Sequence, residues 1–143
     1  MRRKSETQIY LEQPGKLDII IKNKLIERQQ LRDIALSITA NMDGERVQSS
    51  GSKSKLANAI DKFVDMEAEI DSLIDKYIGI KKEVIQTIEQ LYSPIEYDIL
   101  FKRYIQQMTL QEIADHYGRD YEWVKVNCQR ACCHVQAIRK RES

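Results

Sequence analysis

Four polar side chains near the C-terminus have the types and spacing needed to hydrogen-bond to the edges of nucleic-acid bases. They are Tyr121, Glu122, Lys125 and Gln129. If a helix begins at about Asp120, this spacing puts all four on its outward side. Lys125 can donate to guanine O6 and N7, and Gln129 can pair with adenine N6 and N7. Glu122 can accept from cytosine N4. A solvated helix face without a ligand is the alternative for each residue.

Basic residues surround these positions and can neutralise phosphate groups. The net charge of the 143-residue chain is only +1, so the whole molecule has no general attraction for nucleic acid. Residues 119–143, however, hold six basic and three acidic side chains. The candidates for phosphate contacts, which set register without reading sequence, are Arg119, Arg130, Arg139 and Lys140.

A cluster of sulfur and imidazole side chains in the same segment suggests metal binding as a second chemistry. Cys128 and Cys132 are four residues apart and share one face of a helix, whereas His134 points elsewhere. A structural zinc site needs four ligands, usually from more than one element. We therefore expect Cys128, Cys132 and Cys133 to be free thiols, the first two in the core, and we expect no metal or other cofactor.

Enzymatic chemistry is not indicated elsewhere in the chain. There is no G-x-x-x-x-G-K-[ST] phosphate loop and no cysteine–histidine pair with triad partners. The acidic residues of 61–75 fall within an amphipathic helical pattern, where a solvated charged face explains them. We expect that the protein is not an enzyme.

The elements that would position these side chains form a helix, a tight turn and a second helix over 109–131. Ala114 is small where two helices cross, and Gly118 supplies a positive φ in the turn. Val124 then packs the second helix against the first. Small, glycine and aliphatic residues at these offsets are typical of a helix-turn-helix DNA-binding unit. A helical hairpin with no role in nucleic-acid binding is the alternative.

Helix-start signals flank this unit and predict a third helix before it. The T-x-x-E pattern of 109–112 and the S-P-I-E pattern of 93–96 are both capping boxes. The second also puts a proline at the first helical position, where its missing N–H costs nothing. The predicted helix extends from about Pro94 to Ile105, and its core residues are Ile99, Leu100 and Tyr104.

Longer helical patterns occupy the N-terminal two thirds of the chain. Apolar residues recur every seven positions from Leu56 to Leu91, which predicts one long helix. A less regular stripe predicts a partner helix over about 16–39, and the glycine- and serine-containing segment 40–53 predicts a connector. The two helices can pair as a hairpin within one chain or as a coiled coil between two chains. The connector is either a surface loop or a phosphate or partner contact through Arg46, Gln48, Ser49, Ser50 and Lys53.

Composition supports an all-α protein of two parts. Charged residues make up 31% of the chain, and it has only 5 glycines and 2 prolines, which disfavours a β fold or disorder. We expect a helical hairpin or coiled coil over 1–92 and a helix-turn-helix domain over 93–143. The basic start, Met1 to Lys4, is followed by no apolar segment, and no membrane-spanning run exists. We therefore expect a cytoplasmic protein without membrane contact.

Two stretches together resemble a known family. One is Arg46-Val47-Gln48-Ser49-Ser50-Gly51 before the long acidic helix; the other is Leu100-Phe101-Lys102-Arg103-Tyr104 followed by Thr109-Leu110-Gln111-Glu112-Ile113-Ala114. From about Leu17 to Ile138 the chain resembles the small ArpU/RinA-like phage transcriptional regulators of Gram-positive bacteria. Its C-terminal part is similar to region 4 of sigma-70-type factors, with cysteines at two positions that are usually aliphatic. The resemblance implies a phage or prophage protein that regulates transcription.

The expected function is therefore sequence-specific binding of double-stranded DNA in transcription regulation. We expect a homodimer, because one helix-turn-helix reads few bases and symmetric dimers read repeated half-sites. The protein can act by recruiting host RNA polymerase or by occupying an operator. The alternative is a coiled-coil adaptor or assembly protein, such as a phage packaging component, with non-specific DNA affinity.

Overall fold

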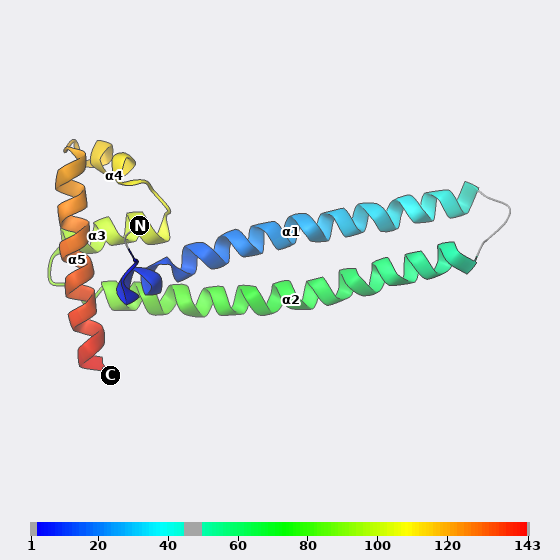
Figure 1. Ribbon diagram of the computed structural model, residues 1–143, viewed down its shortest axis with the longest axis horizontal. Coiled ribbons are helices and arrows are strands. Elements are labelled where there is room, and N and C mark those ends of the chain that lie inside the picture. Colours follow the sequence, from blue (N-terminus) through cyan, green and yellow to red (C-terminus); the bar gives the residue numbers. More distant parts are fainter. Residues whose placement is uncertain (1–2, 45–49, 143) are drawn as a thin grey trace. The chain divides into compact units, whose positions relative to one another are not determined.

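Helices account for all of the regular structure in the described part of the chain. The computed structural model describes residues 3–44 and 50–142, and these ranges contain no β-strand (Figure 1). The elements in order are α1 (Glu6–Gly44), α2 (Ser50–Ile88), α3 (Pro94–Leu100), the π-helical turn η1 (Phe101–Ile105), α4 (Leu110–Tyr117) and α5 (Tyr121–Glu142). The prediction of an all-α fold with two long N-terminal helices is confirmed.

Helix α1 begins earlier than the sequence pattern predicts. It starts at Glu6 rather than at about residue 16, and it continues through Pro14. Ser5 caps it, since the Ser5 hydroxyl accepts from the Gln8 N–H at 3.2 Å and the Gln8 side chain accepts from the Ser5 N–H at 3.1 Å. A proline inside a helix removes a backbone hydrogen bond. Burial of the turn that contains Leu11, which has no exposed surface, offsets that cost.

The connector between the long helices is shorter than predicted. Helix α1 extends to Gly44 and α2 begins at Ser50, so the helices include both ends of the predicted segment 40–53. Of the predicted contact residues, Arg46, Gln48 and Ser49 lie outside the described residues. Lys53 is an exposed side chain in the first turns of α2.

The described chain packs as two compact units. One unit is 18–76, in which the larger, C-terminal part of α1 and the larger, N-terminal part of α2 form an antiparallel hairpin within a single chain. Ion pairs join these helices: Lys24 Nζ lies 3.2 Å from a Glu69 carboxylate oxygen, and Arg28 lies 3.0 Å from Glu67. The hydrogen bond to Glu69 raises the pKa of Lys24. Among the described residues of this hairpin, the buried apolar ones are Ile21, Ala59 and Ile70.

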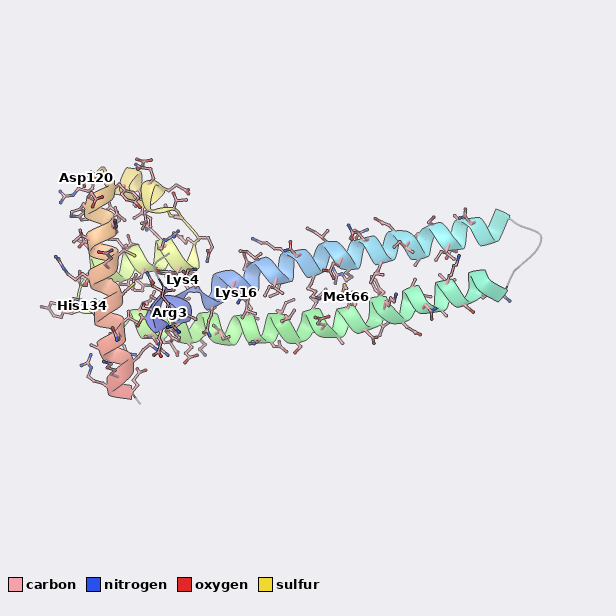
Figure 2. The ribbon with its side chains drawn as sticks, in the orientation of Figure 1. Arg3, Lys4, Lys16, Met66, Asp120 and His134 are labelled. Atoms are coloured by element: carbon pink, nitrogen blue, oxygen red, sulfur yellow. The ribbon has the colours of Figure 1, made fainter. Side chains whose placement is uncertain are left out.

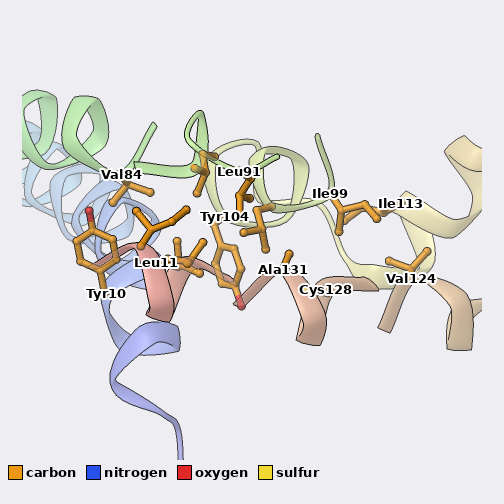
Figure 3. Close-up of a cluster of buried hydrophobic side chains, with 14 of the residues drawn as sticks. Tyr10, Leu11, Val84, Leu91, Ile99, Tyr104, Ile113, Val124, Cys128 and Ala131 are labelled. Carbon is orange, nitrogen blue, oxygen red and sulfur yellow. The ribbon is translucent and has the colours of Figure 1, made fainter. Parts of the chain in front are cut away.

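The other unit contains the described residues of 1–17 and 77–143. Side chains from the start of α1, from the end of α2 and from each of α3, η1, α4 and α5 form its core, as Figure 3 shows. Leu11, Val84 and Ile88 are fully buried in the same cluster as Ile99 and Val124. Packing therefore divides the chain differently from the predicted boundary at 92/93, because both long helices contribute apolar residues to this core.

Helix α3 starts where the S-P-I-E pattern predicts, but its capping box is incomplete. The Ser93 hydroxyl accepts from the Glu96 N–H at 3.3 Å, and Pro94 is the first helical residue. The Glu96 carboxylate does not return to Ser93; it is 5% exposed and contacts His134 Nδ1 of α5 at 2.6 Å. The predicted core residues Ile99, Leu100 and Tyr104 are all buried.

Candidate nucleic-acid interface

The interface predicted from the sequence centres on α4, a short turn and α5, and α4 begins with a complete capping box. The Thr109 hydroxyl accepts from the Glu112 N–H at 3.1 Å, and the Glu112 carboxylate accepts from the Thr109 N–H at 3.1 Å. Two of the free amide donors at this helix start are therefore satisfied. The predicted start of the helix is confirmed.

Gly118 closes α4 in the left-handed backbone region, with φ +62 and ψ +33. The Arg119 N–H donates to the Ala114 carbonyl at 3.0 Å, and the Gly118 N–H donates to the Asp115 carbonyl at 3.2 Å. These two bonds form the Schellman arrangement, which satisfies the last carbonyls of α4 and reverses the chain. Residue 118 thus has the positive φ that its glycine predicts.

Small and aliphatic side chains hold α4 against α5. Ala114 and Val124, the two packing positions predicted from the sequence, both have no exposed surface. Ile113 on α4 and Ala131 on α5 are also fully buried. An alanine at the crossing lets two helix backbones approach closely, so a larger residue at 114 would push α5 away.

The predicted base-contact residues lie on α5 outside the buried stripe that packs against the core. Asp120 caps the helix, since its carboxylate accepts from the Trp123 N–H at 3.0 Å. Tyr121 is 42% exposed, Glu122 and Gln129 are exposed, and Lys125 is partly buried. These side chains therefore share an accessible helix face that offers both hydrogen-bond donors and acceptors.

An aromatic side chain that sequence reasoning did not select organises the turn. The Trp123 ring lies 5.5 Å from the Tyr117 ring, centroid to centroid, and the Arg119 guanidinium lies 4.6 Å from the Trp123 centroid. Cation–π contact thus holds Arg119, a predicted phosphate ligand, beside the first turn of α5. The segment Y-G-R-D-Y-E-W, with one arginine among three aromatic residues, was the available sequence signal.

Asp98 joins α3 to α4 beneath the turn. Its carboxylate accepts from the Tyr117 hydroxyl and from Lys102 Nζ, the latter at 2.8 Å. Partial burial acts to raise the pKa of Asp98, but the hydrogen bonds from Lys102 and Tyr117 outweigh it and lower the pKa. Burial and the same carboxylate raise the pKa of Tyr117. The charged carboxylate therefore fixes Tyr117, which in turn contacts Trp123.

The other predicted phosphate-contact residues lie farther along α5. Arg130 and Lys140 are exposed. Arg139 is partly buried, and its guanidinium stacks 3.8 Å from the centroid of the Tyr10 ring of α1. Arg139 therefore also ties α5 to the start of α1, which the sequence analysis did not anticipate.

The cysteines of α5 border the core. Cys128 is 8% exposed, Cys132 is partly buried and Cys133 is exposed; all three are free thiols. A hydrogen bond from the Cys132 thiol lowers the pKa of Cys128, and the same bond raises the pKa of Cys132. In the part of the chain that the structure describes, no group of three or more histidine, cysteine or acidic side chains is placed to hold a metal ion.

None of the helices described here combines the length and apolar character that crossing a membrane requires.

Comparison with known proteins gives no match to this chain, whether against protein-family models, curated proteins or solved structures.

Proposed function

We propose that this protein is a sequence-specific regulator of transcription that binds double-stranded DNA and has no enzymatic activity. The observation that carries the proposal is the geometry of the α4–turn–α5 unit. A left-handed Gly118 reverses the chain, Ala114 and Val124 lock the crossing, and the polar face of α5 remains accessible. A DNA-reading helix-turn-helix needs this combination of rigid support and an exposed second helix.

In this proposal α5 is the recognition helix of a domain similar to region 4 of sigma-70-type factors. Its first turns enter the major groove, and Tyr121, Glu122, Lys125 and Gln129 face base edges. Arg119, Arg130, Arg139 and Lys140 contact backbone phosphates. The family resemblance favours an ArpU/RinA-like role in the cytoplasm of a bacterium that carries the phage or prophage. Regulation then proceeds through host RNA polymerase or through occupation of an operator by a homodimer.

Two substitutions on α5 separate base reading from phosphate contact. The duplex enriched by selection from random DNA and a scrambled duplex serve as ligands at near-physiological salt. Lys125→Ala should weaken binding to the enriched duplex by about 1–3 kcal/mol and reduce discrimination between the two. Arg130→Ala should weaken binding to both duplexes alike and lower the salt slope by about 1. A Lys125→Ala protein with full discrimination would remove Lys125 from the recognition surface.

Exposed apolar side chains on the 18–76 hairpin favour a second candidate, an adaptor or assembly protein. On α1 and α2 they are Ile19, Ile26, Ile34, Leu36, Ile60 and Val64, each 47–60% exposed. Such side chains can pack against a protein partner. An adaptor would bind the enriched and scrambled duplexes equally, and its affinity for DNA would depend on the salt concentration and not on the base sequence.

A further inference from the structure

A short basic arm precedes α1 and lies beside the recognition face of α5. The arm consists of Arg3 and Lys4, both exposed. Figure 2 labels Arg3 and Lys4 before the first turns of α1. A hollow of about 460 Å³ lies between this arm and α5, whose Gln129, Cys133 and Gln136 line it. Residues 3 and 129 are far apart in the chain, so no local sequence pattern indicates that they lie close together.

The stripe of α5 that borders the hollow continues the predicted base-contact face. Lys125, Gln129, Cys132 and Gln136 follow one another at spacings of four, three and four residues, which is one face of a helix. Along the helix axis, Lys125 and Gln136 are about 16 Å apart. At about 3.4 Å per base pair, this distance corresponds to roughly five base pairs, so one duplex can lie against both ends of the stripe.

The arm is held in place by the packing of the helix that follows it. Ser5 and Gln8 form the capping box of α1, and Thr7 is 4% exposed. One turn later, the Tyr10 hydroxyl is hydrogen-bonded to the Thr87 hydroxyl at 2.9 Å, and the Arg139 guanidinium of α5 stacks on the Tyr10 ring. The first turns of α1 are therefore anchored to α2 and α5, and they carry the arm to a defined position beside α5.

The charges around the hollow suit an anionic partner. Among the described residues that line it, only Arg3 and Lys4 are charged, and the other polar ones carry neutral hydroxyls, amides, thiols and a phenol. Lys4 also pairs with Glu12 at 2.9 Å, with the lysine side chain 63% exposed. An exposed ion pair of this kind contributes little and exchanges readily for a phosphate.

We propose that Arg3 and Lys4 contact backbone phosphates of the same duplex whose bases α5 reads. The inference rests on the proposed function and adds to it a second phosphate-binding element outside the helix-turn-helix. Each arm residue that neutralises one phosphate should contribute about 0.9 to the salt slope of binding.

The test measures the affinity of the full chain for the enriched duplex as salt is varied. The double variant Arg3→Ala/Lys4→Ala should bind at least about tenfold more weakly at near-physiological salt, with a salt slope lower by about 1 to 2. The charge-matched control Lys55→Ala/Lys76→Ala removes two exposed lysines of α2 in the 18–76 hairpin and should change both quantities less. Unchanged affinity and slope in the arm variant would overturn the inference.

A substitution of opposite sign gives an independent check. Glu12→Gln removes the carboxylate that pairs with Lys4, so it should strengthen binding to the enriched duplex by about two- to threefold. Equal or weaker binding would contradict the role of Lys4. If the wild-type protein does not distinguish the enriched duplex from a scrambled one, the proposed function fails first, and that outcome is separate from failure of the arm alone.

Discussion

At the scale of single residues, one carboxylate links the helix before the candidate interface to the interface itself. Asp98 on α3 accepts hydrogen bonds from Lys102 and from Tyr117, and Tyr117 contacts the Trp123 ring that orients Arg119. The hydrogen bonds favour the charged form of Asp98 and lower its pKa despite partial burial. A group of this kind stabilises the fold while it is ionised, and acid removes that stabilisation.

Asp98→Asn should therefore lower the free energy of unfolding by about 1 kcal/mol near neutral pH, since the exposed third of the side chain weakens the effect. The penalty relative to wild type should shrink as pH falls from 7 to about 2, because the carboxylate takes up a proton first in the unfolded chain and, at lower pH, in the native protein. Denaturant unfolding at both pH values measures it. A penalty that is constant with pH would contradict this account of Asp98.

Tyr117→Phe is the matching variant, because it removes only the hydroxyl. Its effect and that of Asp98→Asn should not add in the double variant, since both break the same hydrogen bond. Full additivity would indicate that the two side chains do not interact in solution.

At the scale of elements, the turn between α4 and α5 fixes how the second helix is presented. A Cβ on Gly118 would meet no heavy atom of the described residues within 4 Å beyond its own chain neighbours, so the requirement for glycine comes from the backbone and not from crowding. With φ +62, a residue that carries a Cβ is strained at this position, whereas glycine is not. Gly79 in α2 is also uncrowded, but it lies in a helix where alanine is preferred.

Gly118→Ala should destabilise the protein by about 1–2 kcal/mol, whereas Gly79→Ala should stabilise it by about 0.5–1 kcal/mol. The two variants make the same chemical change, and only the backbone conformation differs. Thermal or denaturant unfolding of both proteins gives the comparison. Equal signs for the two changes would mean that the turn does not hold residue 118 in the left-handed region.

Local signals account for most of what the sequence predicts correctly at this scale. The Thr109 box, Gly118 and the heptad from Leu56 are each set by neighbours in the chain, so pattern rules locate these elements. The early start of α1 could not be predicted from its Pro14, because burial of Leu11 against distant helices offsets the cost. The Glu96–His134 contact and the position of the arm beside Gln129 are likewise long-range, and no local spacing encodes them.

At the scale of the whole molecule, two surface features bear on the partners that the protein can bind. The net charge is only +1, yet 119–143 carries a basic excess, which is where the proposed DNA contacts lie. The 18–76 hairpin instead exposes apolar side chains on both helices. We propose that the hairpin joins two copies of the chain, and that the paired recognition helices read repeated half-sites.

Ile60→Asp/Val64→Asp should convert the proposed dimer into a monomer, because these neighbouring side chains of α2 are 47% and 58% exposed. Analytical ultracentrifugation measures the mass, and circular dichroism checks that helix content is kept. Asn58→Asp/Ser72→Asp adds the same charge to exposed polar positions of α2 and should leave the dimer intact. A wild-type protein that sediments as a monomer at micromolar concentration would contradict the proposed dimer.

In the proposed function, α5 reads a DNA sequence. The most direct measurement is a binding selection on random duplex DNA with the purified full-length protein at near-physiological salt. We expect one enriched motif, bound at least about 10³-fold more tightly than random duplex. A motif built of two repeated half-sites would also report the dimer geometry. A folded protein that enriches no motif would contradict the claim and favour the adaptor function, with the 18–76 hairpin as the surface for its protein partner.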